Sequence, residues 1–354
     1  MIKRDKRRHD VITARIKRTL LTDQNGSHSF TRNFMHSALR LSLLGVVAIG
    51  LSGGAHTLPQ NVPLPEGQFI PGLDSLKVEQ LGEGLYTFRW EAYRSIFMVT
   101  DDGVIATDPQ STIAAEKYVA EIRKITDKPI KYLVYSHSHW DHVSGGQIFK
   151  DEGATIIAQE ECKKNMEMSP NPDVIHPDVT FKDTYSVELG GTSLDLYYFG
   201  PSHDTCLVVM IPRPHKMLYS VDIVNGPTGK YVPFDPVAAD FHFYNAVNYL
   251  SEMEALAERE GLTSLIAAHL VPAPDGPGRF KELPTLGPIG AIAEKRIFWE
   301  QAINTVKQAL DDGANPLTIQ ETLDTSAFEH YRGYDPEEFK ILVRRISSYL
   351  SIGR

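Results

Sequence analysis

Cysteine is scarce in this sequence, since Cys162 and Cys206 are the only two among 354 residues. Two cysteines are too few for a disulfide framework, and neither stands in a Cys-x-x-Cys spacing typical of zinc sites. One disulfide is compatible with an oxidising compartment, but we favour two buried free thiols, which are common in folded proteins. We therefore expect a hydrophobic core to hold the fold, and the hydrophobic content of 42% is ordinary for a globular protein.

Positive charge is also scarce beyond the start of the chain. Residues 1–40 hold ten Lys and Arg against three Asp and Glu, whereas the remaining residues hold 26 against 42. Binding to nucleic acid depends on clustered Lys and Arg, so this acidic body argues against a nucleic-acid substrate. We expect a small-molecule substrate instead.

Apolar runs are too short to span a bilayer comfortably, for which about 20 residues are needed. The apolar stretch at residues 41–51 follows the basic start and precedes small residues, the order of a secretory signal peptide. We expect residues 1–55 to be a signal peptide or export segment, and the protein to be periplasmic or secreted. Translation from Met35 would give a signal peptide of ordinary length, and an uncleaved membrane anchor is the alternative.

Strand and helix patterns begin after a Pro- and Gly-rich arm at residues 56–77. A hairpin turn at Asp101-Asp102-Gly103 joins two strand-like runs, and helical periodicity follows at residues 112–125 and again near 239–260. The predicted strands are residues 84–90, 95–100, 103–107, 130–135, 155–158, 193–199, 207–211, 217–221 and 264–268. Strands first in hairpins and later alternating with helices indicate stacked sheets with helices on their outer faces.

The character of the chain changes after residue 272. A Pro- and Gly-rich stretch leads into helical segments at residues 291–312, 317–323 and 336–352. We expect residues 273–354 to be a C-terminal helical extension packed on the preceding part, because it is shorter than a typical domain. The sequence leaves open whether the extension covers a cleft or forms a homodimer interface.

Four potential metal ligands, His137, His139, Asp141 and His142, fall within six residues directly after the strand at 130–135. His137 and His139 are two residues apart, so their side chains can point the same way from extended chain. Asp141 and His142 can then serve a second metal position nearby. Imidazole suits zinc, and carboxylate mixed with imidazole also suits manganese or iron. Three further candidate ligands each follow an apolar run: His203, Asp222 and His269.

In this order, His-x-His-x-Asp-His followed by His, Asp and His, the sequence resembles the metallo-β-lactamase-fold hydrolase superfamily over residues 78–272. The resemblance implies an α+β fold, a four-layer αββα sandwich with a cleft for two zinc ions at one edge of its sheets. Manganese and iron are the alternatives. It also implies which residues hold each metal. His137, His139 and His203 would hold the first metal, Asp141, His142 and His269 would hold the second, and Asp222 would bridge the two. Asp108 matches a supporting position behind the ligands.

Departures from the family pattern are modest. Val221 precedes Asp222 where the family usually has Gly, and His269 lies in Ala-His-Leu rather than Gly-His-Gly. Both leave the ligand set intact. Asp222 stands where the best-known true β-lactamases have Cys, so the chain is more similar to hydroxyacylglutathione hydrolases and lactonases.

The expected function is hydrolysis of an ester, lactone or thioester-like substrate. Two metals about 3.5–4 Å apart can share a water and lower its pKa, giving a bridging hydroxide that attacks the substrate. Asp141 is the expected catalytic residue, which orients this nucleophile and moves a proton. β-Lactam hydrolysis and an iron-dependent dioxygenase of the same fold are the alternatives. The acidic body disfavours nuclease activity, and the intact ligand set disfavours a non-enzymatic binding protein.

Aromatic residues and other histidines carry less information. Trp140, between ligands, could face a substrate or the core. Five aromatic residues could line an apolar pocket, although such residues are more often in the core: Tyr231, Phe234, Phe241, Phe243 and Tyr244. We interpret the remaining histidines as ordinary polar residues: His176, His215, His242 and His330.

Overall fold

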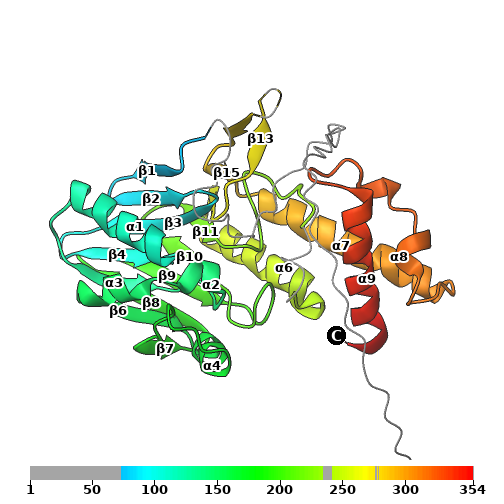
Figure 1. Cartoon of the computed structure of the whole chain (residues 1–354), viewed down its shortest axis with the longest axis horizontal. Helices are drawn as coiled ribbons and strands as arrows, with labels where there is room; N and C mark the ends of the chain where they lie inside the picture. The colour runs from blue at the N-terminus through cyan, green and yellow to red at the C-terminus, as the bar shows by residue number, and fades with distance from the viewer. Residues whose placement is uncertain (1–72, 234–240, 276, 278, 354) are drawn as a thin grey trace, which may run out of the picture. The chain divides into compact units, whose positions relative to one another are not determined.

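The computed structural model describes residues 73–233, 241–275, 277 and 279–353 (Figure 1). The predicted export segment, residues 1–55, lies outside the described residues, as does most of the arm at 56–77. Among the helices of the described part, none is long and apolar enough to cross a membrane.

Two mixed sheets form the centre of the fold. The first has the order β1-β2-β3-β4-β5-β6-β7, antiparallel as far as β4 and parallel from there on. Its strands are β1 (Leu76–Gly82), β2 (Leu85–Trp90), β3 (Tyr93–Val99), β4 (Val104–Thr107), β5 (Ile130–Val134), β6 (Thr155–Gln159) and β7 (Val179–Phe181). The second has the order β15-β12-β11-β10-β9-β8, with one parallel pair, β11 and β12. Its strands are β8 (Thr184–Leu189), β9 (Thr192–Tyr198), β10 (Val208–Pro212), β11 (Met217–Ser220), β12 (Ser264–Ala267) and β15 (Leu286–Pro288).

Side-chain alternation along β3 explains how the layers stack. Ile96 and Met98 point into one hydrophobic cluster, which fills the space between the sheets and continues to the far side of the second sheet. Phe97, between them, points into another cluster shared with the outer helices α1 (Thr112–Ile125), α3 (Gly146–Asp151) and α4 (Glu160–Met168). Since successive strand residues face opposite sides, the first sheet is buried on both faces. On the far side, α6 (Phe243–Arg259) covers the second sheet, which confirms the predicted α+β fold of two sheets between helices.

Local sequence accounts for the helix bounds that matched prediction. Ser111 caps α1 by accepting a hydrogen bond from the Ala114 amide, and Arg123 and Lys124 lie in its last turn, where cations favour the helix dipole. In α9 (Pro336–Ile352), the Asp335 side chain accepts from two amides of the first turn, and Pro336 occupies a position where it costs no hydrogen bond. The predicted hairpin at residues 101–103 also forms, with Gly103 close to the Pro129 carbonyl where a Cβ would lie 2.7 Å from that oxygen.

The C-terminal helices share the larger core. They are α7 (Ala291–Asp311), α8 (Ile319–Thr322) and α9, with a short 3-10 turn at Ser326–Phe328. Trp299 of α7 is buried and stacks on Phe241 at 4.3 Å between ring centroids, next to the start of α6. These helices therefore pack on the helical layer over the second sheet.

Residues 272–288 contain strands that the sequence pattern did not indicate. β13 (Pro272–Pro274) and β14 (Phe280–Glu282) form a hairpin, and β15 pairs antiparallel with β12. The second sheet thus continues past position 272, where we expected the catalytic part to end. Gly287 is required in β15, because a Cβ there would lie 2.3 Å from the Pro227 carbonyl oxygen. Three-residue strands are too short to show a period of two.

The interpretation of Cys162 and Cys206 as free thiols was wrong, since the two form a disulfide. Cys162 lies in α4 and Cys206 lies just before β10, with 5.2 Å between their Cα atoms. The bridge joins segments 44 positions apart in sequence. Their proximity results from the packing of α4 against the end of the second sheet, which the local sequence does not show.

Candidate metal centre

The candidate ligands converge from the ends of both sheets. His137 and His139 lie in the loop after β5, and His142 lies in the short helix α2 (Trp140–Val143). His203 lies in the loop between β9 and β10, while Asp222 and His269 follow β11 and β12. Because these strands end at the same edge, five imidazoles and one carboxylate meet there.

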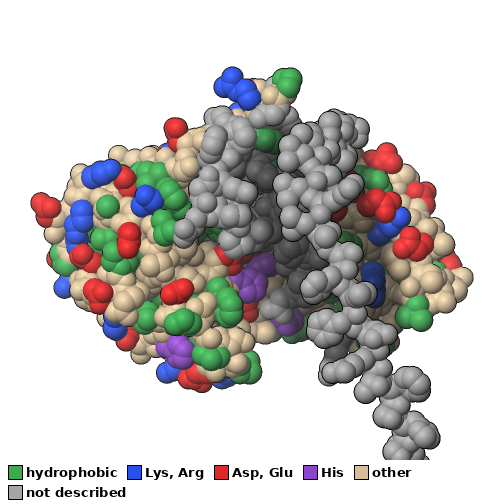
Figure 2. Space-filling view, in the orientation of Figure 1, with side chains coloured by type: hydrophobic (Ala, Val, Ile, Leu, Met, Phe, Trp, Pro, Cys, Tyr) green, Lys and Arg blue, Asp and Glu red, His purple; other side chains and the backbone are tan. Residues whose placement is uncertain are grey.

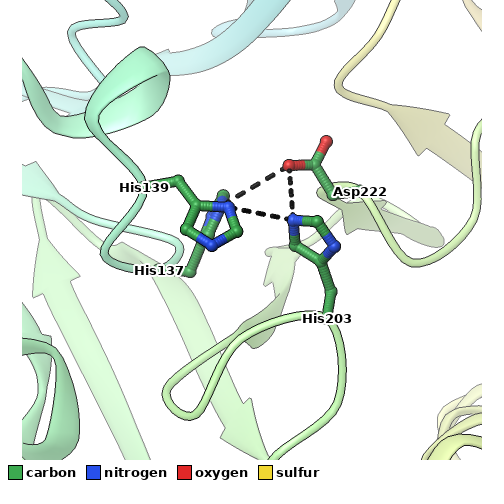
Figure 3. Close-up of side chains that lie close together, drawn as sticks. All are labelled: His137, His139, His203 and Asp222. Carbon is green, nitrogen blue, oxygen red and sulfur yellow. Dashed lines mark hydrogen bonds and ion pairs between the residues drawn. The ribbon is translucent and has the colours of Figure 1, made fainter. Parts of the chain in front are cut away.

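The first ligand group consists of His137, His139, His203 and Asp222, whose candidate ligand atoms all lie within 4.8 Å of one another (Figure 3). His203 Nε2 is 3.0 Å from His139 Nδ1 and 3.2 Å from Asp222 Oδ2. His137 Nε2 is 3.4 Å from the same oxygen. The three rings point at one spot beside this oxygen.

The second group consists of His142, Asp222 and His269. His142 Nε2 is 3.2 Å from Asp222 Oδ2, and His269 Nε2 is 2.6 Å from Asp222 Oδ1. The Nε2 atoms of the two histidines are 3.3 Å apart. Asp222 belongs to both groups, so its carboxylate is placed to join two cations.

The electrostatics of the cluster favour bound cations. Burial would raise the pKa of Asp222, but His269 and His142 hold it well below its ordinary value. Burial and the neighbouring His139 lower the pKa of His137 well below its ordinary value, whereas Asp222 and Asp141 outweigh burial and raise the pKa of His142. His137 Nε2 is buried with no hydrogen-bond partner in the described part of the chain. Metal ions would satisfy such inward-facing nitrogens and replace the protons, so the donor set fits them.

The backbone of Asp222 is strained. Its φ of 57° lies in the left-handed region, which non-glycine residues adopt at a cost of order 1–3 kcal/mol. The turn is closed by the Ile223 amide, which donates to the Val221 carbonyl at 2.6 Å, and Val221 and Ile223 are buried. This core packing holds the carboxylate toward both groups of histidines.

Asp141 lies beside the second group but is not part of it. Its Oδ2 is 3.8 Å from His142 Nε2, and its side chain is 18% exposed, against 1% for Asp222. Its neighbour Trp140 is 52% exposed, so Trp140 is not a core residue. The Asp141 carboxylate is therefore more accessible to solvent than that of Asp222, and Trp140 lies at the surface. Figure 2 shows histidine side chains reaching the surface near the centre of this face.

Asp108 lies behind the ligands, as expected from the resemblance. Its Oδ1 accepts a hydrogen bond from the Ser136 amide at 2.8 Å, and its Oδ2 is 3.7 Å from His142 Nδ1. A carboxylate behind a ligating imidazole fixes the orientation of the ring and makes its other nitrogen a better ligand.

Asp204 is a second buried carboxylate behind the ligands, and the sequence analysis missed it. It accepts hydrogen bonds from the Ser138 amide at 2.8 Å and the Ser138 hydroxyl at 2.6 Å. Asn165 of α4 donates to its other oxygen at 3.1 Å. Asp204 thus joins the loop of His137 and His139 to the loop of His203. Its position directly after His203 was the only available indication, and it was weak.

Tyr93, at the start of β3, was also missed. Its ring packs edge-on against His269 at 4.8 Å and against His142 at 5.6 Å between centroids. Burial and the carboxylates of Asp141 and Asp222 raise the pKa of its phenol, which therefore stays protonated at neutral pH.

Most of the other aromatic candidates are core residues. Tyr231, Phe241 and Phe243 are buried, Tyr244 is 60% exposed, and Phe234 lies outside the described residues. Among the described residues, neither ligand group includes any of the histidines interpreted as ordinary: His176, His215, His242 and His330.

Comparison with known families identifies the class of this protein. The model of the Metallo-beta-lactamase superfamily matches residues 93–269, half of the chain. The chain belongs to this superfamily, whose members are metal-dependent hydrolases. The predicted resemblance is confirmed.

Several known proteins are similar to this chain. It is 26% identical over 175 residues to the 2,4-dinitroanisole O-demethylase subunit alpha of Nocardioides sp. (strain JS1661), covering 48% of this chain and 52% of that protein. It is 27% identical over 172 residues to the linear primary-alkylsulfatase of Pseudomonas sp. (strain ATCC 19151), covering 36% of this chain and 32% of that protein. The metallo-beta-lactamase type 2 of Elizabethkingia meningoseptica is 25% identical to this chain over 198 residues, covering 53% of this chain and 74% of that protein. The chain spans about half of the length of the first relative and about a third of the second.

Solved structures agree on the fold. The metallo-beta-lactamase from Pontibacter korlensis superposes with a TM-score of 0.52 at 17% identity, covering 64% of this chain and 99% of that one. The two-sheet core therefore has the same fold as that structure.

The separation of the ligands into two groups predicts how many metal ions the chain binds when a single histidine is replaced. We expect about two metal ions per wild-type chain and about one after His269→Ala, since His269 belongs to the second group alone. Elemental analysis after dialysis against micromolar zinc measures this. The matched control is His176→Ala, which removes an exposed imidazole apart from the site and should leave about two. Two metals retained in His269→Ala, or none in the wild type, would contradict the assignment.

Proposed function

We propose that this protein is a metal-dependent hydrolase that uses two metal ions, zinc by preference, to cleave an ester, lactone or thioester-like small molecule. The main supporting observation is the position of Asp222, whose carboxylate belongs to both ligand groups. Its Oδ2 lies 3.2 Å from Nε2 of both His203 and His142, and its Oδ1 lies 2.6 Å from His269 Nε2. A carboxylate shared in this way suits two adjacent cations. When bound, such ions activate a water and polarise the substrate oxygen that it attacks.

The protein's own side chains have separate tasks in this proposal. His137, His139 and His203 would hold one cation, and His142 and His269 would hold the other, with the carboxylate of Asp222 available to both. Asp108 supports the His142 imidazole from behind, and Asp204 joins the loop of His137 and His139 to the loop of His203. Five neutral imidazoles and one carboxylate would leave most of the charge of two bound divalent ions uncompensated, which would favour a substrate with a developing negative charge.

Asp141 is the proposed catalytic residue. Its carboxylate is more exposed than that of Asp222 and lies at the open side of the second group. From there it can orient an attacking water and accept its proton. It can also complete the second set of ligands, as the resemblance implies.

The substrate class rests on the ligand chemistry. Asp222 in place of Cys favours the ester and lactone class over β-lactams. β-Lactam hydrolysis is the second candidate, since the relative from Elizabethkingia meningoseptica is a metallo-beta-lactamase. An iron-dependent dioxygenase would require iron as the native metal. Lys and Arg are scattered rather than clustered over the described part of the face in Figure 2, which agrees with a small-molecule substrate.

A substrate panel tests this proposal. Zinc-loaded protein should hydrolyse at least one member of a set of aryl esters, lactones, thioesters, an alkyl sulfate and a β-lactam. Asp141→Asn should lower kcat about 10²- to 10⁴-fold, because general acid–base catalysis contributes about that much. Asp151→Asn, a change in an exposed carboxylate of α3, is the matched control and should keep kcat. No turnover of any member, or full activity of Asp141→Asn, would refute the corresponding part of the proposal.

We also propose that the protein is exported. The buried disulfide between Cys162 and Cys206 supports this, because disulfides persist mainly in oxidising compartments. Expression of the full chain in a bacterial host should give a protein outside the cytoplasm that begins near residue 56, as read by N-terminal sequencing. Full-length protein in the cytoplasm with two free thiols would show the proposal to be mistaken.

A further inference from the structure

Tyr93 is fixed in place beside the second ligand group. It forms an isolated antiparallel bridge with His269, and the flanking hydrogen bonds run from the Arg94 amide to the Ala268 carbonyl and from the Leu270 amide to the Ala92 carbonyl. The first sheet is thereby tied to the loop that carries His269. The position of the Tyr93 ring is set by this pairing and by its edge-on contacts with His142 and His269.

The hydroxyl of Tyr93 differs from that of the other deeply buried tyrosines. Tyr93 is 6% exposed, and its hydroxyl has no hydrogen-bond partner in the described part of the chain. The hydroxyls of four others each donate to a backbone carbonyl, at distances from 2.7 to 3.0 Å: Tyr118, Tyr135, Tyr219 and Tyr249. An unpaired buried hydroxyl costs free energy, so its presence beside the ligands requires a reason.

The surroundings of this hydroxyl suggest what it binds. The carboxylate of Asp141 lies close enough to act on the phenol through its charge and as an acceptor, and Asp222 acts on it through its charge, although no direct hydrogen bond to the hydroxyl forms. Both edge contacts of the ring are with imidazoles of the second group. A protonated phenol is a hydrogen-bond donor, and the partner that it lacks is an acceptor. A substrate oxygen held at the second group would be such an acceptor.

We propose that the Tyr93 hydroxyl donates a hydrogen bond to a substrate oxygen at the His142–Asp222–His269 group and stabilises the negative charge that this oxygen gains during hydrolysis. The phenol keeps its proton throughout, so no bond to Tyr93 is made or broken. The inference rests on the proposed hydrolase function and adds a specific side chain to it. It makes Tyr93 a catalytic residue contributed by the first strand of the matched region.

Tyr93→Phe tests the inference, with Tyr118→Phe as the matched control. We expect Tyr93→Phe to lower kcat about 10²-fold with little change in KM, because a donor aimed at developing charge acts in the transition state. Bound metal should stay at the wild-type level, and the melting temperature should fall less than in Tyr118→Phe, because the Tyr93 hydroxyl makes no direct hydrogen bond within the described residues. Tyr118→Phe removes a hydroxyl that donates to the Ile96 carbonyl, so it should lower the melting temperature and keep kcat.

Binding of inorganic phosphate to the zinc-loaded protein gives a readout that needs no substrate. Phosphate presents tetrahedral oxygens to the site, and calorimetry should show at least tenfold weaker binding to Tyr93→Phe than to the wild type and Tyr118→Phe. Unchanged phosphate binding and unchanged kcat would overturn the inference. A loss of metal in Tyr93→Phe would also overturn it, because Tyr93 would then position a ligand such as Asp141. If Tyr93→Phe binds phosphate more weakly than the wild type, but the wild type turns over no substrate of the panel, the inference about Tyr93 is supported. Only the proposed hydrolase function is then contradicted.

Discussion

The buried carboxylate of Asp222 is the group on which both halves of the site depend. It lies between two sets of imidazoles, within 3.4 Å of a nitrogen of His137, His142, His203 and His269. A carboxylate out of water is costly unless positive charge compensates it. Burial alone would raise the pKa of Asp222, yet His269 and His142 hold it well below the ordinary value. The arrangement of imidazoles around this carboxylate therefore favours the binding of cations.

The fold supplies what this arrangement requires. Asp222 adopts a left-handed backbone conformation that a flexible loop would not maintain, and the larger hydrophobic core on both sides of the second sheet holds it there. Asp108 and Asp204 fix the surrounding loops from behind, each by hydrogen bonds to backbone amides. The disulfide between Cys162 and Cys206 anchors α4 close to Asp204. The strain at Asp222 is thus offset by packing elsewhere.

The sequence predicted the parts of this structure that have local causes. The order of seven ligands at strand ends indicated the superfamily, and periodicity with capping residues located helices such as Thr112–Ile125 and Pro336–Ile352. Contacts between distant segments were not predictable in this way. The pairing of Cys162 with Cys206, the addition of β15 to the second sheet and the contact of Tyr93 with His269 all join residues separated along the chain. None of them leaves a periodic pattern in the sequence.

The central claim is that two cations share Asp222. Crystals of the zinc-loaded protein measured at the zinc absorption edge test it most directly. The account predicts two anomalous peaks about 3.5–4 Å apart. One should lie among His137, His139 and His203, the other beside His142 and His269, with Asp222 in contact with both. A single peak at full zinc loading, or peaks away from Asp222, would contradict the account.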